Sequence, residues 1–198
     1  MTLYGMPIFL EDKSGRLTGS EFIDIHDRMR FSYRCTARDS AHTAYMIYNL
    51  SAMVYQGSCP RAVVALDFGP NNALGTVSFS SRETVPMKKY LPKISNHGGA
   101  YKPRKFVASD SQEYIWSYRT QEGQEWTCTN TSGYLVAYYS LKVPGEPHYE
   151  GSSGCTLTID EAFGHIAAEC LASLMIMRHI AEYNCLIITL LLPLYHSF

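Results

Sequence analysis

Apolar and polar residues alternate in short runs through most of the chain between residues 20 and 160. Alternation with a period of two sends successive side chains to opposite faces of a strand, so each run predicts a strand. One run, 61–68 (RAVVALDF), is apolar enough to be buried on both faces. The other predicted strands are 22–25, 29–36, 43–55, 74–80, 83–85, 87–91, 105–109, 113–119, 125–129, 134–143 and 155–159. Short strands separated by frequent turn signals indicate an all-β barrel or sandwich.

The pattern changes after Asp160. Residues 163–185, FGHIAAECLASLMIMRHIAEYNC, are apolar on nearly every side of a helix, which is typical of a fully buried helix. Asp160 is a suitable N-cap, so the predicted helix covers about 161–183. A membrane span needs roughly 18 or more apolar residues without charge. Because Glu169 and Arg178 interrupt the stretch, we expect no transmembrane span and predict that the strands wrap around this helix.

The predicted helix carries one polar seam. At 100° per residue, one stripe of the helix contains Glu161, His165, Glu169 and Ser173. Buried polar groups need partners. We therefore expect the seam to face an open end of the barrel or to pair with polar groups on the strands. His179 and Glu182, near the helix end, are expected to face solvent.

The chain of 198 residues is long enough for one domain with a full hydrophobic core, and we find no linker that would divide it. We expect residues 1–19 to be a loose leader, residues 20–184 to form the domain, and residues 185–198 to be an apolar tail. The tail, LIITLLLPLYHSF from residue 186, could close the barrel, contact a membrane or mediate oligomer formation.

Composition excludes several classes of protein. The chain has 17 basic and 18 acidic residues, a balance that argues against a nucleic-acid partner. Its six cysteines include no CxxC pair, so neither a zinc ribbon nor a thioredoxin-like site is expected. We find no dinucleotide or phosphate-loop motif and expect no metal or other cofactor. The N-terminus lacks the pattern of a signal peptide, so we expect a cytoplasmic protein with reduced thiols.

The order of several segments resembles a fungal domain of unknown function that is abundant in mushrooms. The segments that carry the resemblance are RAVVALDF (61–68), VSFSSRETVPMKKYLPK (77–93), FVASD (106–110), EYIW (113–116), WTC (126–128), LVAY (135–138), LTID (157–160) and LMIMR (174–178). That domain is similar to the tubby C-terminal and LURP-one group. The resemblance covers about residues 20–184 and implies a closed antiparallel barrel of about a dozen strands around a central hydrophobic helix.

The resemblance implies a fold and not an activity, because fold does not determine function. Tubby domains bind phosphoinositides and scramblase-like relatives act at membranes, so the resemblance suggests a lipid ligand. No phosphoinositide-binding motif can be matched to residues of this chain.

His165 and Glu169 are the candidate catalytic pair. Their i, i+4 spacing places them on one helix face, where they could exchange a proton with a substrate. The alternative is a hydrogen-bonded buried pair without a catalytic role.

Aromatic residues of the predicted strands are candidates for a ligand-binding wall, because apolar pockets are lined in this way. The residues we propose for this wall are Tyr114, Trp116, Trp126 and Tyr138, with Ser173 from the helix seam. The alternative is that these rings only fill the core.

A basic run without carboxylates is a candidate site for an anionic headgroup or membrane surface. Its members are Lys88, Lys89, Lys93, Lys102, Arg104 and Lys105. The alternative is a solvated loop.

Three functions fit these features. The first is a binding module for an apolar small molecule or a lipid, with peripheral contact to anionic membranes. The second is a cofactor-independent cyclase or isomerase that acts on a hydrophobic metabolite. The third is an interaction protein with a filled core that assembles through residues 186–198.

Overall fold

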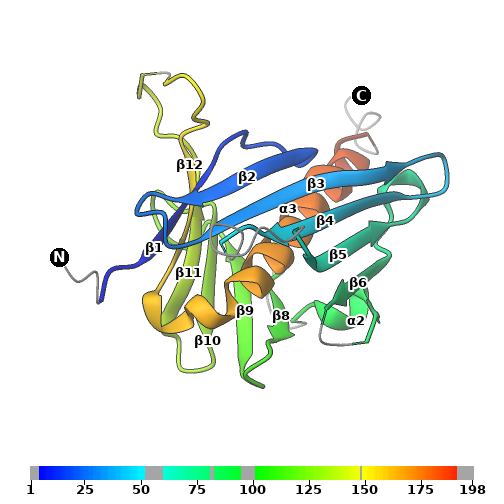
Figure 1. Ribbon diagram of the computed structural model, residues 1–198. Coiled ribbons are helices and arrows are strands. Elements are labelled where there is room, and N and C mark those ends of the chain that lie inside the picture. The colour runs from blue at the N-terminus through cyan, green and yellow to red at the C-terminus, as the bar shows by residue number, and fades with distance from the viewer. Residues whose placement is uncertain (1–4, 52–59, 81–82, 95–100, 148, 191–198) are drawn as a thin grey trace, which may run out of the picture.

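The computed structural model of the protein describes residues 5–51, 60–80, 83–94, 101–147 and 149–190, with side chains described as far as Tyr183. Twelve strands and one long helix dominate this part of the chain (Figure 1). The strands are β1 (Ile8–Asp12), β2 (Gly19–Asp24), β3 (Arg30–Arg38), β4 (Thr43–Asn49), β5 (Ala62–Phe68), β6 (Thr76–Phe79), β7 (Val85–Pro86), β8 (Arg104–Val107), β9 (Glu113–Tyr118), β10 (Trp126–Asn130), β11 (Leu135–Ser140) and β12 (Cys155–Ile159). The helical elements are η1 (Pro70–Asn72), α2 (Met87–Tyr90), η2 (Glu161–Ile166) and α3 (Ala167–Leu190).

All twelve strands form one antiparallel sheet in the order β7-β6-β5-β4-β3-β2-β1-β12-β11-β10-β9-β8. Strands β1 to β7 make one meander and β8 to β12 make another. The two meanders are joined where β1 pairs with β12, with Ile8 opposite Ile159 and Asp12 opposite Cys155. This pairing leaves β7 and β8 as the edges of the sheet.

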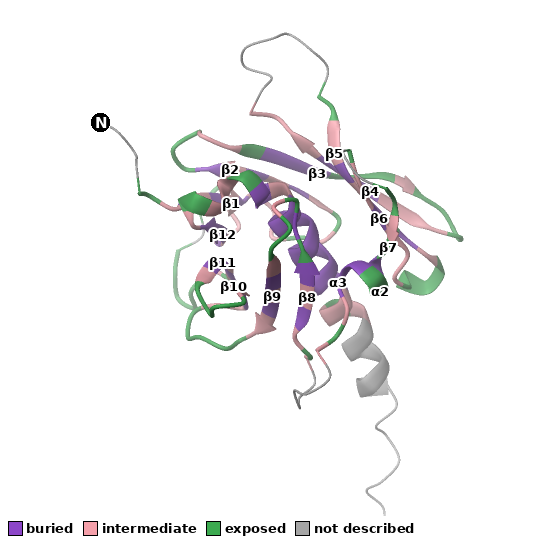
Figure 2. Ribbon diagram, turned by 90° about the horizontal axis from the view of Figure 1, so that it is seen from below, coloured by how far each residue is buried: buried purple, intermediate pink, exposed green. Residues whose placement is uncertain are grey.

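The expectation of a closed barrel is wrong, because the sheet curves around α3 without joining its two edges (Figures 1 and 2). Strand β7 is only two residues long and ends in Pro86, which has no N–H to donate to a further strand. The helix α2 follows at once and packs against β6, β7 and β8. A short helix thus occupies the position where pairing between β7 and β8 would close a barrel.

Residues 87–91, which were predicted to be a strand, form α2 and the residue after it. The N–H of Met87 donates to the carbonyl of Gly75 at 2.9 Å, and the N–H of Leu91 donates to the carbonyl of Met87 at 2.8 Å. Met87 and Tyr90 are buried while Lys88 and Lys89 are exposed, which is the i, i+3 spacing of one helical turn. In so short a segment this spacing is easily mistaken for strand alternation.

The expectation of a loose leader is also wrong for residues 8–12, which form β1 in the middle of the sheet. Ile8, Leu10 and Asp12 face the core and the residues between them are only half-buried. Asp12 points inward, where an apolar residue would be expected, so the sequence of β1 does not show the alternation of a strand. A carboxylate is rarely a core residue unless it is paired. The partners of Asp12 are described below with the candidate site.

The helix begins differently from the prediction. Asp160 does cap it, since its carboxylate accepts from the N–H of Ala162 at 2.9 Å, but the first six residues wind as the 3₁₀ element η2. The α-helix starts at Ala167 and continues to Leu190, beyond the predicted end near residue 183. The expected tail therefore starts inside α3. Residues 191–198 lie outside the described residues, as do the side chains of 186–190, so the oligomer contact predicted there stays a prediction.

Side chains fill the space between α3 and the sheet, and most of the described α3 is coloured as buried in Figure 2. From Ile166 to Met177 nearly every helix residue is buried, and the inward residues of β1 to β6 and β8 to β12 pack around them. Trp116, Tyr33, Tyr114 and Tyr139 are among the largest fully buried side chains. Close packing of this kind leaves the ends of the helix as the places where a ligand can approach it.

Candidate functional site

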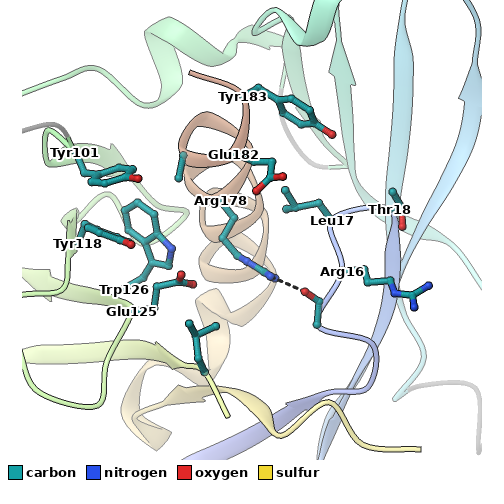
Figure 3. A pocket seen from close by; sticks show the side chains of 13 residues that line it. Arg16, Leu17, Thr18, Tyr101, Tyr118, Glu125, Trp126, Arg178, Glu182 and Tyr183 are labelled. Carbon is teal, nitrogen blue, oxygen red and sulfur yellow. Dashed lines mark hydrogen bonds between the residues drawn. The ribbon is translucent and has the colours of Figure 1, made fainter. Parts of the chain in front are cut away.

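A cavity of about 520 Å³ lies beside the last described turns of α3 (Figure 3). It is bordered by the loop between β1 and β2, by aromatic residues on and near β9 and β10, and by one face of α3. Its lining residues are Gly15, Arg16, Leu17, Thr18, Tyr101, Tyr118, Glu125, Trp126, Leu141, Arg178, Ala181, Glu182 and Tyr183. Trp126 is the one residue of the predicted ligand wall that lines this cavity.

A buried ion pair forms one side of the cavity. Arg178 donates to Asp12 Oδ2 at 3.2 Å and to the carbonyl of Gly15 at 2.7 Å. The side chain of Asp12 is 0% exposed and that of Arg178 is 11% exposed. The guanidinium also lies over the Tyr139 ring, 4.5 Å from its centroid. Arg178 is therefore held in one position before any ligand arrives.

Asp12 has further donors besides Arg178. The Gly15 N–H and the Ser20 hydroxyl donate to Oδ1 at 2.9 and 2.5 Å, and the Tyr139 hydroxyl donates to Oδ2 at 2.8 Å. Burial raises the pKa of Tyr139, so its hydroxyl stays protonated and remains a donor. These bonds compensate the cost of burying a carboxylate.

Gly15 gives the loop between β1 and β2 the shape that this network needs. Its φ of +66° lies in the left-handed region, which side chains other than glycine rarely adopt. The resulting turn directs the Gly15 N–H to Asp12 and its carbonyl to Arg178. The loop thereby becomes a fixed wall of the cavity.

Three aromatic rings form the opposite wall. Tyr101 and Tyr118 have ring centroids 4.1 Å apart, and Tyr118 and Trp126 have centroids 4.8 Å apart. The rings of Tyr101 and Trp126 meet edge to face at 6.4 Å. Tyr118 and Trp126 are directly opposite each other on β9 and β10. Because the rings support one another, the wall is ordered without a ligand.

Glu125 lies between this aromatic wall and Arg178 (Figure 3). Its N–H donates to the carbonyl of Tyr139 and its carbonyl accepts from Arg119 N–H, at 2.8 and 2.9 Å. Burial raises the pKa of Glu125, and Arg178, Arg119 and a hydrogen bond with the Trp126 side chain act in the opposite direction. The site thus contains a half-buried carboxylate beside the aromatic wall.

A neighbouring hollow of about 580 Å³ shares Glu125 and Leu141 with this cavity. Most of its other lining comes from the exposed β9–β10 turn, residues 119–124, and from residues 142–144. It lacks the aromatic wall and the buried ion pair of the first cavity. We therefore take the first cavity as the candidate site.

The predicted catalytic residues lie at the other end of the described helix and have separate partners. Glu169 is buried and accepts from the N–H and hydroxyl of Ser109 at 3.1 and 2.8 Å. The side chain of His165 is 54% exposed, and its Nε2 lies 3.3 Å from Asp110 Oδ2. Asp110 also accepts from the hydroxyl of Tyr114 at 2.5 Å. The polar seam is therefore divided: His165 and Glu169 pair with the loop between β8 and β9, and only Ser173 pairs with a strand, through Trp116 on β9. Glu161 accepts from the N–H of Gly5.

The remaining predicted wall residues do not line the cavity. Trp116 is fully buried and its Nε1 donates to Ser173 Oγ at 2.8 Å, while the Ser173 hydroxyl donates to the carbonyl of Glu169 at 2.7 Å. Tyr114 is fully buried at the Asp110 cluster, and Tyr138 is half-buried on β11. Trp116 and Ser173 therefore connect the helix to the sheet.

The predicted basic run is divided by the strand geometry of β8. Arg104 is buried and donates to the carbonyl of Leu91 at 2.7 Å, which ties the segment after α2 to β8. Lys105, on the opposite face, pairs with Glu113 at 2.8 Å. The members that are exposed are Lys88, Lys89, Lys93 and Lys102. The six basic residues, which lie between positions 88 and 105 in the sequence, therefore do not share one surface.

Sequence reasoning missed most of the candidate site. Residues 15–18, Tyr101 and Arg178 are far apart in the chain, and only the β1–β12 pairing and the curvature of the sheet bring them together. A charged residue at position 178, after a long apolar helical stretch, was the one available signal. A buried arginine needs a carboxylate partner, and Asp12 on β1 is the partner of Arg178.

Within the described residues no group of three or more histidine, cysteine, aspartate or glutamate side chains could hold a metal ion. Among the described helices, none has the length and hydropathy needed to cross a membrane. The cysteines that the structure describes with side chains, Cys35, Cys128, Cys155 and Cys170, are free thiols.

The chain belongs to a family of unknown function, DUF6593, whose family model matches residues 24–182. No curated protein and no solved structure matches the chain. The family assignment supplies no activity, so a function has to be argued from the site itself.

Proposed function

We propose that this member of the DUF6593 family is a binding module that holds a small molecule in the cavity between the aromatic wall and the C-terminal part of α3. The observation that carries the proposal is the ordered wall of Tyr101, Tyr118 and Trp126 facing the fixed Asp12–Arg178 pair. Because neither side has to rearrange, a ligand loses little affinity to ordering of the protein.

The size of the cavity supports a small-molecule ligand. A volume of about 520 Å³ lies within the range of roughly 300–1,000 Å³ that is usual for such sites. An apolar or planar part of the ligand would contact the rings, and a polar part would face Glu125 and Glu182. The filled core between α3 and the sheet favours this end of the helix over a ligand enclosed within the fold.

A ligand at this end of α3 does not require a lipid or a membrane. Membrane contact through the exposed lysines, the fungal origin and the likeness to the tubby and LURP-one group remain predictions. The alternative of a cyclase or isomerase stays a prediction too, since it depends on His165 and Glu169 at the far end of the described helix.

The two tryptophans allow a direct test. Both tryptophans are buried, but Trp126 lines the cavity and Trp116 does not, so their indole N–H signals in ¹⁵N NMR spectra report on the site and on the fold separately. We expect members of a small-molecule library to shift the Trp126 signal and to leave the Trp116 signal in place.

A variant that fills the cavity provides the control. Ala181 lines the site on α3, so Ala181→Phe should abolish the shifts while the Trp116 signal shows that the fold is kept. Val107→Phe, which adds the same ring at an exposed position of β8, should leave binding unchanged. The proposal fails if no library member moves the Trp126 signal, or if Ala181→Phe binds the hits as well as the unmodified protein.

A further inference from the structure

We infer that the cavity selects a ligand that carries a positive charge, such as an amine or a quaternary ammonium group, and holds this group between the aromatic wall and the carboxylates of Glu125 and Glu182. The inference rests on the proposed function and names the chemical class of its ligand.

The charges around the cavity favour a cation. The carboxylates are Glu125 and Glu182 in the lining and Asp12 behind Arg178. The guanidinium groups of the lining are Arg16 and Arg178. A third guanidinium group, that of Arg119, lies over the Tyr118 ring of the wall, so carboxylates and guanidinium groups are equal in number around the site. The exposed side chain of Arg16 points away from the aromatic wall (Figure 3), so beside the wall itself the carboxylates outnumber the guanidinium groups by one.

Arg178 is a poor partner for an anionic ligand because Asp12 compensates its charge. Its two terminal nitrogens already donate to Asp12 and to the Gly15 carbonyl, and its face lies over Tyr139. An anion at the remaining N–H groups would meet a guanidinium whose charge Asp12 already compensates, and would lie near the Glu125 carboxylate. Arg178 therefore acts as part of the wall.

The aromatic wall adds an attraction for cations. The faces of tyrosine and tryptophan rings carry partial negative charge, and a cation within about 6 Å of a ring centroid is attracted to it. Tyr118 already attracts one cation, since the guanidinium carbon of Arg119 lies 5.1 Å from its ring centroid. Tyr101 and Tyr118 are half-buried and Trp126 is almost fully buried, so the two tyrosine rings present most of the wall to an ammonium group.

Glu125 completes the site because it is half-buried beside these rings. Burial raises the pKa of this carboxyl group, while Arg178, Arg119 and a hydrogen bond with the Trp126 side chain act in the opposite direction. A cationic ligand next to Glu125 would be attracted to its carboxylate more strongly than in open water, because the region is partly shielded from water.

The test compares three probes of nearly equal shape and different charge. Choline is the cation, 3,3-dimethylbutan-1-ol is its uncharged carbon counterpart, and 3,3-dimethylbutanoate is the anion. Each is titrated into the ¹⁵N-labelled full chain while the indole signals of Trp126 and Trp116 are followed. We expect choline to shift the Trp126 signal with an affinity at least about tenfold higher than the alcohol or the anion.

A matched pair of variants then tests the role of the carboxylate. Glu125→Gln keeps the shape of the side chain and removes its charge, and should weaken choline binding by about tenfold. Glu122→Gln removes an exposed charge from the same β9–β10 connection and should change the affinity by less than about twofold, since exposed charges are screened by salt.

The outcomes separate this inference from the proposed function. If the alcohol or the anion shifts Trp126 as strongly as choline, or if Glu125→Gln binds choline unchanged, the cation inference is wrong and the binding module stands. The cation inference is also wrong if choline has no effect while uncharged library members bind at Trp126. If neither these probes nor the library move the Trp126 signal, both proposals fall.

Discussion

At the scale of single residues, the most consequential side chain is Asp12, a carboxylate in the middle of the sheet. It accepts hydrogen bonds from Gly15, Ser20, Tyr139 and Arg178, which belong to a loop, two strands and the helix. A buried ion pair contributes little relative to a well-packed apolar pair, but removal of one partner leaves the other charge unpaired. The network therefore makes the relative position of these elements specific.

Variants of this pair should be strongly destabilised. We expect Asp12→Asn and Arg178→Met each to lower the free energy of unfolding by about 3–5 kcal/mol, measured by urea denaturation. The double variant should lose less than the sum of the two, because no unpaired charge is left. Glu21→Gln, which removes an exposed partner of Arg34 at 3.7 Å, should cost about 1 kcal/mol or less. Additive losses in the double variant would contradict the coupling.

His179 is a second buried polar residue, although it was expected to face solvent. Its ring stacks on Phe68 with centroids 3.7 Å apart, and its Nε2 lies 3.0 Å from the carbonyl of Asn72. Burial lowers the pKa of His179 below the ordinary value of 6.5, and the hydrogen bond to Asn72 opposes this. The folded protein thus prefers the neutral ring.

This preference predicts a pH dependence of stability. Above pH 6.5 both folded and unfolded states hold a neutral ring, so His179 adds no pH dependence there. As the pH falls below 6.5, the unfolded chain binds the proton more readily, and stability decreases until the lowered pKa of the folded state is reached. His179→Phe should keep the ring stacking and flatten the stability curve in this window. Unfolding midpoints in urea between pH 5 and 8 test it, and an unchanged slope would show that other groups cause the dependence.

At the scale of elements, α2 has an importance that its four residues do not suggest. It follows the two-residue edge strand β7 and directs Met87 and Tyr90 into the core, next to the edge strand β8. The same turn exposes Lys88 and Lys89. The helix thus covers the opening of the sheet with apolar side chains on one face and charges on the other.

The two faces of α2 should respond differently to truncation. Met87 is completely buried, so Met87→Ala should lower the free energy of unfolding by about 2–5 kcal/mol. Its exposed neighbour gives the control, since Lys88→Ala should change stability by no more than about 0.5 kcal/mol. Equal effects in urea denaturation would mean that α2 does not seal the core.

Most individual strands could be predicted because one face of each is buried, so the alternation of residues is visible in the sequence. β1 and α2 were misjudged for opposite reasons: an inward carboxylate interrupts the alternation in β1, and a single helical turn imitates it in α2. Alternation also explains the divided basic run, because neighbours such as Arg104 and Lys105 face opposite sides of β8. The local pattern of apolar and polar residues thus predicts strands and helices, but it does not predict which charged side chains share a surface.

At the scale of the whole molecule, closure of the sheet and the candidate cavity could not be predicted. Both depend on which strands pair over long sequence distances, and side-chain alternation does not contain this information. The family resemblance led to a closed barrel, whereas the structure ends the sheet at β7 and β8. The burial of the apolar helix was confirmed, because a helix that is apolar all round has few other places to lie.

The pairing of β1 with β12 should make the two meanders unfold together. Both tryptophans lie in the second meander, on β9 and β10, while circular dichroism reports on the whole sheet. We expect the tryptophan fluorescence and circular dichroism transitions to coincide in urea. Leu10→Ala, at the buried centre of β1, should move both transitions together by about 2–5 kcal/mol. Separate midpoints would show that the meanders are independent units.

The same pairing has a consequence for synthesis on the ribosome. The partner of Asp12 on β12 is Cys155, which is translated roughly 140 residues later, or about 7–30 s at 5–20 residues per second. During this interval the side of β1 that will contact β12 has no strand to pair with, and an unpaired strand edge can associate with other chains. Asp12 gives β1 a charge while this strand has no partner. A residue that stabilises the finished fold would then also keep the nascent chain soluble until its last strand is made.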